Sequence, residues 1–319
     1  MNTQAGDHPI ELRLWRQFLA VADELHFGRA ALRLHMTQPP LTQAIANLEQ
    51  QLGVRLFDRT KRSVQLTAAG TALMPEARDL LARAQALPQH ARAAARGEVG
   101  RLRLAFVSTA GFSLLPQWVQ AFRSQYPQVE FELVEATGDV QLRLLERGEI
   151  DAGFMLHSPG FAPADLQHLR ITREPLVTAL PSQHPLATTR ILSLSAVLDE
   201  PLVIFPRRIV PSLHDAIFGM YHAAKRTPQV AQEAIQMQTI VNLVSAGLGI
   251  AWVPESVRQF QRPGIVYRQP SGRQALQVPS CETTLAWTAG KAAPTLERFV
   301  EFARKQVRGS VRQGSPGLG

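Results

Sequence analysis

The amino-acid sequence predicts an α/β protein that starts with a separate, mostly helical module. Residues 1–66 show helical spacing of apolar side chains, followed by a short basic hairpin. Residues 67–96 are predicted to form one long helix rich in Ala, Leu, Arg and Gln. From residue 97 to residue 308, apolar strand-like runs alternate with helical patterns, which is typical of a parallel sheet covered by helices. The last segment, residues 309–319, has a turn-like composition and is predicted to be disordered.

The overall composition is that of a soluble globular protein. The 319 residues are 45% hydrophobic and 19% charged, and this length leaves room for two or three domains. The formal net charge of +8 indicates an anionic partner without identifying it. A single cysteine, Cys281, excludes internal disulfides and thiolate zinc sites and fits a reducing compartment. Because there is no long apolar run and no secretory signal in residues 1–10, we expect a cytoplasmic protein without membrane contact.

Three helices are predicted in the first module. The first follows from apolar side chains at helical spacing, namely Trp15, Phe18, Leu19 and Ala22. The second is short and covers residues 28–34. The third begins at Thr37, a suitable N-cap, because the consecutive prolines Pro39 and Pro40 fit a helix only in its first turn. We expect this helix to end at Gly53.

The third helix has two different faces. The apolar face, which we expect to be buried, consists of Leu41, Ala44, Ile45, Leu48 and Leu52. The outer face is rich in amides and hydroxyls and consists of Gln38, Thr42, Gln43, Ala46 and Asn47. A nearly uncharged outer face is unusual for a helix that only meets water, whereas amides and hydroxyls can read base edges in the major groove of DNA.

A basic hairpin is predicted directly after this helix. Its strands are residues 55–57 and 64–66, and its tip carries Arg59, Lys61 and Arg62. A basic hairpin after a helix pair suits contact with phosphates or with a minor groove. The order of helix, short helix, turn, polar helix and hairpin therefore indicates a winged helix-turn-helix. The alternative is a plain helical subdomain with incidental charges.

The sequence resembles the LysR-type transcriptional regulators. The resemblance rests on ordered segments that run from residue 12 to residue 70 and continues more weakly to about residue 305, and its main carriers are residues 12–25, 27–31, 37–45, 48–49, 52–59 and 66–70. The run His26-Phe27-Gly28-Arg29, together with the pair Pro39-Pro40, is most similar to members that govern the catabolism of aromatic acids.

The resemblance implies that the module binds double-stranded promoter DNA. Base contacts are implied for Gln38, Pro39, Thr42 and Gln43, and Arg62 is implied to enter a minor groove beside Arg59 and Lys61. Family members often carry Arg or Ser where this chain has Gln43. Since Gln pairs best with adenine and Arg with guanine, we expect a different base preference at that step. Replacing Arg62 by Ala should weaken binding to all sequences and flatten its salt dependence.

The long helix of residues 67–96 carries a heptad pattern. We expect Thr67 to cap it, and the pattern predicts a seam of leucines and alanines for dimerisation, made of Leu73, Ala77, Leu80, Ala84 and Leu87. The alternative is that this stripe packs against its own chain, and the family resemblance, which implies antiparallel pairing with a second subunit, favours the seam. Pro75 and Pro88 should each kink or end the helix, and the sequence does not decide between the two.

Residues 97–308 resemble the family's effector-binding domain, which implies a periplasmic-binding-protein-like fold of two α/β subdomains. We expect subdomain I over residues 97–171 and 279–308, and subdomain II over residues 172–278. In an open α/β sheet, hydroxyl side chains and glycines at the points where strands lead into helix N-termini can form a binding site for an anion.

The effector, a small-molecule carboxylate, is expected to bind between the two subdomains. The predicted contacts are Ser108, Thr109, Thr137, Phe205 and Arg207. For the hydroxyl residues the alternative is local capping of helices, and for Arg207 it is simple exposure to solvent. Many relatives have a second hydroxyl where this chain has Gly138, so this chain lacks that donor and its sequence does not identify the ligand.

The sequence carries none of the motifs for common catalysis. It has no Gly-x-Ser-x-Gly elbow, Walker A loop, dinucleotide-binding loop or His-Glu-x-x-His motif, and its nine histidines form no recognisable metal motif. We therefore expect a regulator without cofactor, metal or enzymatic activity, acting as a homodimer or homotetramer with RNA polymerase as a further partner. The alternative is an α/β binding protein or transferase with an N-terminal helical oligomerisation module and no DNA binding.

Overall fold

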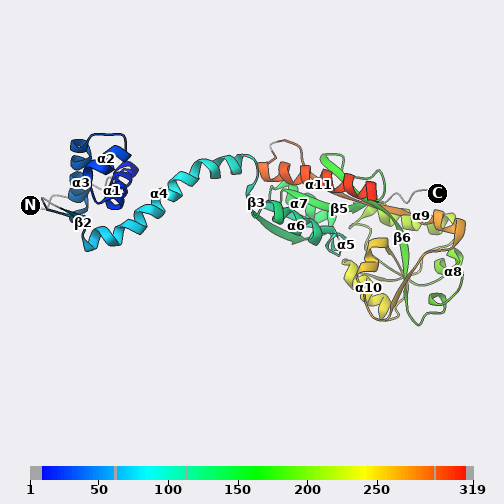
Figure 1. The fold of residues 1–319 in the computed structure, drawn as a ribbon. Helices are drawn as coiled ribbons and strands as arrows, with labels where there is room; N and C mark the ends of the chain where they lie inside the picture. Colours follow the sequence, from blue (N-terminus) through cyan, green and yellow to red (C-terminus); the bar gives the residue numbers. More distant parts are fainter. Residues whose placement is uncertain (1–8, 61–62, 113, 291, 314–319) are drawn as a thin grey trace, which may run out of the picture. The chain divides into compact units, whose positions relative to one another are not determined.

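A computed structural model describes residues 9–60, 63–112, 114–290 and 292–313. The chain divides into two compact units, Met1–Arg92 and Ala93–Gly319 (Figure 1). Each unit has its own hydrophobic core and is described by itself.

The first unit is a helical module with a two-stranded hairpin. Its elements are α1 (Leu12–Glu24), α2 (Phe27–Arg33), α3 (Gln38–Leu52), β1 (Phe57–Arg59), β2 (Val64–Leu66) and most of α4 (Ala68–Ala95). The hairpin strands pair antiparallel, with Phe57 opposite Leu66. The core lies between α1, α2, α3 and the hairpin, and its fully buried side chains include Phe18, Val21, Leu41, Ile45 and Leu48. The predicted winged helix-turn-helix is thus present.

Local signals explain where these helices begin and end. Gly53 stops α3 because it adopts the left-handed conformation, with φ at 67°. The Thr67 hydroxyl accepts a hydrogen bond from the amide of Gly70 at 3.0 Å, which confirms Thr67 as the cap of α4. Neither Pro75 nor Pro88 ends α4, which stays helical through both prolines.

The second unit consists of two α/β lobes. Lobe I is built on β3 (Val99–Phe106), β4 (Gln128–Glu135), β5 (Ala152–His157), the first part of β6 (Leu166–Pro181) and β11 (Ser280–Thr288). Its helices are α5 (Ser108–Gly111), α6 (Leu114–Gln125), α7 (Gly138–Glu146) and α11 (Pro294–Gln313). The phenylalanines of α6 and α11 pack on one face of the sheet, whereas Leu145 and Ile150 cover the other.

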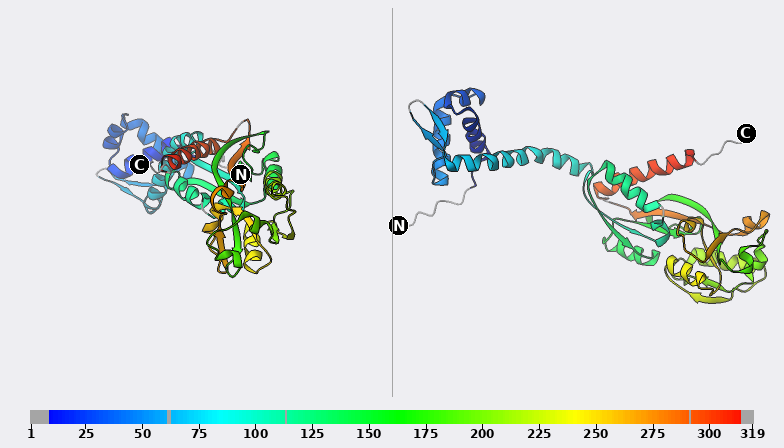
Figure 2. Two further views of the ribbon diagram at one scale, coloured as in Figure 1. Left: turned by 90° about the vertical axis from the view of Figure 1, so that its right-hand side faces the viewer. Right: turned by 60° about the horizontal axis from the view of Figure 1, so that its bottom comes forward.

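Lobe II contains the rest of β6 and shorter elements. Its strands are β7 (Leu202–Ile204), β8 (Val230–Glu233), β9 (Ala251–Pro254) and β10 (Ile265–Arg268). Its α-helices are α8 (Leu194–Leu198), α9 (Pro211–Ala223) and α10 (Met237–Ser245), and its 3-10 helices are η1 (Pro185–Ala187), η2 (Glu255–Gln259) and η3 (Gly272–Gln277). In Figures 1 and 2, α11 (red) lies on lobe I and α10 (yellow) on lobe II.

The strand β6 belongs to both lobes, so the predicted boundary near residue 171 falls within this strand. Its first part pairs with β11 and its last part with β9 and β10, so the strand order is β10-β6-β11-β5-β3-β4. All pairs made by β6 and β11 are antiparallel, whereas the pairs β3–β4, β3–β5 and β7–β8 are parallel as predicted. Residues 176–180 continue the strand into lobe II, where all five side chains are buried and the four apolar ones belong to the hydrophobic core of that lobe.

The C-terminal helix reaches into the segment that we expected to be disordered. Disorder was predicted from residue 309, whereas α11 continues to Gln313. No proline interrupts the run until Pro316, so the helix passes through Gly309.

Candidate nucleic-acid interface and ligand cavity

The outer face of α3 is on the surface of the first unit. Gln38, Pro39 and Gln43 are exposed, as are Ala46 and Asn47, whereas Leu41, Ile45 and Leu48 are completely buried. Thr42 is half-buried, and its hydroxyl donates to the carbonyl of Gln38 at 3.1 Å. The predicted uncharged face therefore presents amides to the outside, supported by an apolar inner face.

The wing is fixed to α3 through Glu49. Its carboxylate accepts hydrogen bonds from the amides of Leu56 and Phe57 at 2.9 and 3.1 Å, and one from the guanidinium of Arg59 at 2.8 Å. The Arg59 guanidinium also lies 4.8 Å from the ring centre of Phe27. Arg59 is therefore an anchor of the wing as well as a predicted phosphate contact. Lys61 and Arg62 lie outside the described residues.

A groove of about 350 Å³ lies between the start of α2, the start of α3 and the wing. Its lining includes Gln38, Thr42 and Arg59, and also His26, which the sequence interpretation did not assign to the surface. The Nδ1 atom of His26 accepts hydrogen bonds from the amides of Gly28 and Arg29 at 3.0 and 3.2 Å. The position of His26 just before a helix was the signal for this capping role.

The predicted seam on α4 divides into two parts. Ala77 is only 3% exposed and packs in the core of its own module, with Leu73 half-buried beside it. The assignment of Ala77 to a dimer seam is therefore wrong, because its own chain already covers it. Leu80 and Leu87 are 42% and 65% exposed, and Ala84 is half-buried. These three stay predicted seam residues.

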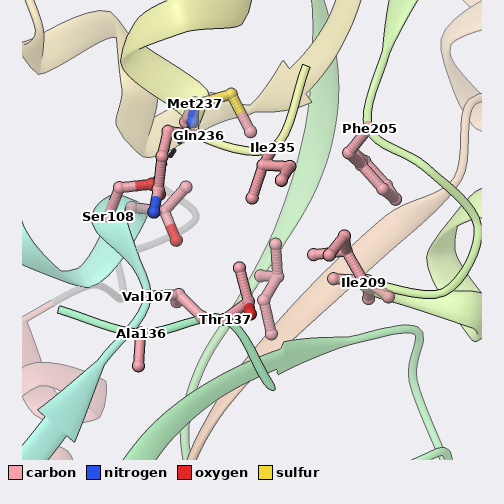
Figure 3. A pocket seen from close by; sticks show the side chains of 12 residues that line it. Val107, Ser108, Ala136, Thr137, Phe205, Ile209, Ile235, Gln236 and Met237 are labelled. Atoms are coloured by element: carbon pink, nitrogen blue, oxygen red, sulfur yellow. Dashed lines mark hydrogen bonds between the residues drawn. The ribbon is translucent and has the colours of Figure 1, made fainter. Parts of the chain in front are cut away.

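A small cavity of about 40 Å³ lies between the two lobes of the second unit (Figure 3). Ser108 and Thr109 reach it from α5, Thr137 from the start of α7, and Phe205 from the end of β7. The structure thus brings four of the predicted effector residues together. It adds a set that the sequence interpretation missed, namely Ile209, Val210, Ile235, Gln236 and Met237.

Arg207, also predicted to contact the effector, does not line this cavity. Its Nε and Nη2 atoms each donate to the carboxylate of Asp215 at 2.7 Å. These hydrogen bonds lower the pKa of Asp215, and the positive charge of Arg207 lowers it further by a smaller amount. The prediction for Arg207 is corrected because a partner one turn into α9 occupies its guanidinium.

The polar groups of the cavity are hydroxyls, one amide and helix N-termini. Met237, the first residue of α10, donates its amide to Ser108 Oγ at 3.4 Å. Thr137 donates its hydroxyl to Asp139 Oδ1 at 2.5 Å and makes no capping bond to a backbone amide of α7. Thr109 is 6% exposed, and its Oγ1 atom has no hydrogen-bond partner among the described residues. The local-capping alternative therefore does not account for Thr109 or Thr137.

A second cavity of about 200 Å³ adjoins the first behind Leu156, Ile209 and Val210. It contains charged groups, those of Asp139 and Arg208. Near it, Ser158 links the lobes, because its amide donates to Ser212 Oγ at 3.1 Å and its hydroxyl to the Ser212 carbonyl at 2.9 Å.

Comparisons with known proteins agree with both units. Residues 12–71 match the model of the bacterial regulatory helix-turn-helix protein, LysR family, and residues 95–308 match the LysR substrate binding domain. The chain is 45% identical over 294 residues to the HTH-type transcriptional regulator IlvR of Caulobacter vibrioides, covering 92% of this chain and 97% of that protein. It is 36% identical over 302 residues to the HTH-type transcriptional regulator AlsR of Bacillus subtilis, covering 93% and 96%.

Solved structures show the same architecture. The crystal structure of CbnR, a LysR family transcriptional regulator, has a TM-score of 0.76 at 31% identity and covers 92% of this chain and 100% of that chain. Full-length CbnR complexed with its target DNA has the same TM-score at 30% identity, covering 93% and 100%.

A winged helical module and a two-lobed α/β domain together define a DNA-binding transcriptional regulator with an effector-binding domain. The chain belongs to the LysR family of bacterial transcriptional regulators, and it is not an enzyme. The alternative of a binding protein or transferase without DNA binding is thereby excluded. Within the described part of the chain, no helix is long and apolar enough to span a membrane, and no group of three or more His, Cys, Asp or Glu residues is placed to hold a metal ion.

Proposed function

We propose that this regulator binds promoter DNA as a homodimer or homotetramer, and that a small organic acid between its lobes controls transcription by RNA polymerase. One copy of α3 covers only a few base pairs, so two modules bound about one helical turn apart multiply the specificity. The exposed outer face of α3 is the single observation that carries the proposal, because Gln38 and Gln43 present amides on a rigid helix beside the Arg59 wing. Chromosomal DNA as the partner would place the protein in the cytoplasm.

The effector would act by favouring one arrangement of the subunits over another. A ligand shifts such an equilibrium only as far as its affinities for the two arrangements differ. The cavity between the lobes suits this role, since its lining comes from both lobes and is linked by Ser108 and the amide of Met237. Subunit arrangement would then set the bend of the promoter and the access of RNA polymerase.

The variant Gln43→Ala tests whether the Gln43 side chain recognises a DNA base. Removing the amide should cost about 1–3 kcal/mol of discrimination at one base pair of each half-site, while phosphate contacts persist. Binding to DNA upstream of the protein's own gene is measured by mobility shift at several salt concentrations, and the preferred site is determined by selection from random DNA.

Gln117→Ala, an exposed glutamine on α6 of the second unit, is the matched control and should leave the site unchanged. An identical binding-site logo for Gln43→Ala and the unmodified protein would refute the base contact. Absence of any shift at low salt would refute promoter binding itself.

A further inference from the structure

We propose that the outer edge of β10 in lobe II binds an extended acidic segment of another protein as an additional strand. This surface is separate from the effector site, because its groove shares no lining residue with either cavity between the lobes. The proposal goes beyond promoter binding, since it concerns a protein partner. Two independent observations carry it, namely backbone groups of β10 that face away from the sheet and a basic groove beside them.

The strand β10 lies at an edge of the sheet in lobe II. Residues 178 and 179 of β6 pair with both β9 and β10, so these two strands lie on opposite sides of β6. Within the described part of the chain, no further strand pairs with β10, which leaves its outer edge open. An open strand edge is a template on which another chain can add a strand.

The register of β10 shows which backbone groups face outward. The carbonyl of Gly264 accepts a hydrogen bond from the amide of Ser182 at 2.9 Å, so these two residues form a hydrogen-bonded pair. Pairs alternate along an antiparallel ladder, and the next pair, Ile265 opposite Pro181, is therefore a non-hydrogen-bonded one. Proline has no N–H to donate, which agrees with this register. The N–H and C=O groups of Ile265, and those of Tyr267 two residues later, consequently point away from β6.

A groove of about 440 Å³ lies beside these groups. It is lined by β10, by η2 and by the segment between them, through Arg258, Gln261, Arg262, Pro263, Ile265 and Tyr267. The intervening segment is held in place at two points. Ser245, the last residue of α10, donates its hydroxyl to the Pro263 carbonyl at 2.9 Å. The Tyr267 hydroxyl donates to the Phe260 carbonyl at 3.2 Å. The groove is thus preformed, which reduces the cost of ordering it when a partner binds.

The charge of the groove favours an acidic partner. Arg258 and Arg262 line it, and none of its lining side chains is acidic. Arg262 is exposed and makes no ion pair or hydrogen bond with another described residue. The contact of Arg258 with Glu255, at 3.8 Å, joins two exposed side chains and contributes little. Carboxylates on a partner can therefore form charge-assisted hydrogen bonds with both guanidinium groups. Pairing of two β10 edges is disfavoured, because it would bring the same arginines of two copies together.

Fluorescence anisotropy with the full-length protein tests the proposal. The probe is a labelled seven-residue peptide of alternating Glu and Val, and a peptide of alternating Lys and Val is its charge control. An excess of a short DNA duplex is present, so that the DNA-binding module does not capture the acidic probe. The Glu peptide should bind at least tenfold more tightly than the Lys peptide, and added salt should weaken its binding.

Methylation of the peptide backbone separates strand addition from attraction by charge alone. Two versions of the Glu peptide carry N-methyl groups on alternate amides, one version on each edge of the extended peptide. Only the amides that face β10 donate hydrogen bonds to it, so one version should lose at least tenfold in affinity and the other should bind like the parent peptide. Equal affinities of the two versions would overturn strand addition.

Variants locate the binding surface on β10 and its groove. Ile265→Pro removes one outward N–H, and proline is tolerated on a strand edge where that group faces solvent. This variant should weaken binding of the Glu peptide at least tenfold, whereas Ile265→Ala, which keeps the N–H, should weaken it less than threefold. Arg262→Glu should also cost at least tenfold. Its matched control is Arg273→Glu, an exposed arginine on η3 outside the groove, which should change the affinity less than twofold.

The remaining outcomes each decide against the proposal. An unchanged affinity in Arg262→Glu or Ile265→Pro overturns it, and so does the absence of binding by the Glu peptide at millimolar concentration. Loss of subunit association in Ile265→Pro, measured by analytical ultracentrifugation, would make this edge a contact between copies of the chain instead. Ile265→Pro should still shift promoter DNA like the unmodified protein, so failure of this proposal leaves the proposed function intact.

Discussion

At the scale of single residues, His26 shows how an exposed polar side chain can organise the DNA-binding module. Its ring nitrogen Nδ1 accepts two amide hydrogen bonds at the start of α2, which requires the tautomer with the proton on Nε2. Gly28 makes this possible, because a Cβ atom there would lie 3.0 Å from the imidazole and 3.4 Å from the amide oxygen of Gln38. The imidazole thus lies next to a predicted base contact.

His26→Ala should destabilise the first unit by about 1 kcal/mol, since a capped helix start loses its acceptor. His26→Asn should retain most of that stability, because an asparagine side chain can accept the same amide hydrogen bonds. Urea unfolding followed by circular dichroism measures the difference. His90→Ala, an exposed histidine on α4, is the control and should unfold like the unmodified protein. Equal stability of His26→Ala and the control would contradict the capping role.

At the scale of elements, α4 shows why a heptad pattern alone does not define an interface. Leu73 and Ala77 have the predicted spacing, but they pack against the core of the first unit rather than against a second subunit. A periodic stripe marks which face is buried, and it does not state what buries it. Further along the same helix, Leu80 and Leu87 remain exposed, so the chain leaves only this later part of the stripe for a partner.

Leu87→Asp should dissociate the proposed dimer, because a charge would replace the predicted apolar contact between two copies of α4. The monomer should not lose stability, since Leu87 is 65% exposed within its own chain. Analytical ultracentrifugation measures the weakened association of the subunits, and we expect the dimer dissociation constant to rise at least tenfold. Gln85→Asp introduces the same charge at an exposed position two residues earlier and should have little effect. An unchanged oligomeric state in Leu87→Asp would exclude this part of α4 as the interface.

At the scale of the whole molecule, local patterns predicted the winged module better than the two-lobed domain. The helices of the first unit follow from the helical spacing of apolar residues and from residues that begin or end a helix, such as Thr67 and Gly53. These signals act over only a few residues. The cavity joins Ser108 to Met237, which are far apart in the chain, and no local signal connects them. The prediction for Arg207 failed for the same reason, since an ion pair depends on packing, and no local pattern indicated that the two lobes share one strand.

A half-buried carboxyl group on the shared strand gives the second unit a pH dependence. Glu174, on β6, accepts hydrogen bonds from the amide and hydroxyl of Ser256, at 2.5 and 3.0 Å. Burial nevertheless raises the pKa of Glu174, because desolvation outweighs these hydrogen bonds. Since the folded pKa exceeds the unfolded one, the folded chain binds more protons between the two values. The contribution to stability is therefore complete below the unfolded pKa, and it is lost as pH rises through the folded pKa.

Glu174→Gln should remove the loss of folding stability that occurs as the pH rises through the pKa of Glu174. The variant and the unmodified protein should have similar Tm values near pH 4, and at pH 7.5 the variant should be higher by roughly 1–3 °C. Differential scanning calorimetry between these pH values measures the change. Glu146→Gln, at the exposed end of α7, serves as the control and should show no pH-dependent gain. A variant that is less stable than the unmodified protein at every pH would show that the hydrogen bonds to Ser256 outweigh burial.

The continuous course of β6 through both lobes affects how the lobes can move relative to each other. Hinges usually lie in loops or at the ends of elements, where a few torsion angles absorb the rotation. Here β6 passes from one lobe to the other and pairs along almost its whole length, with β11 in lobe I and with β9 and β10 in lobe II. A rotation of one lobe against the other would therefore change the twist of this strand, in addition to any change in the loops that also join the lobes.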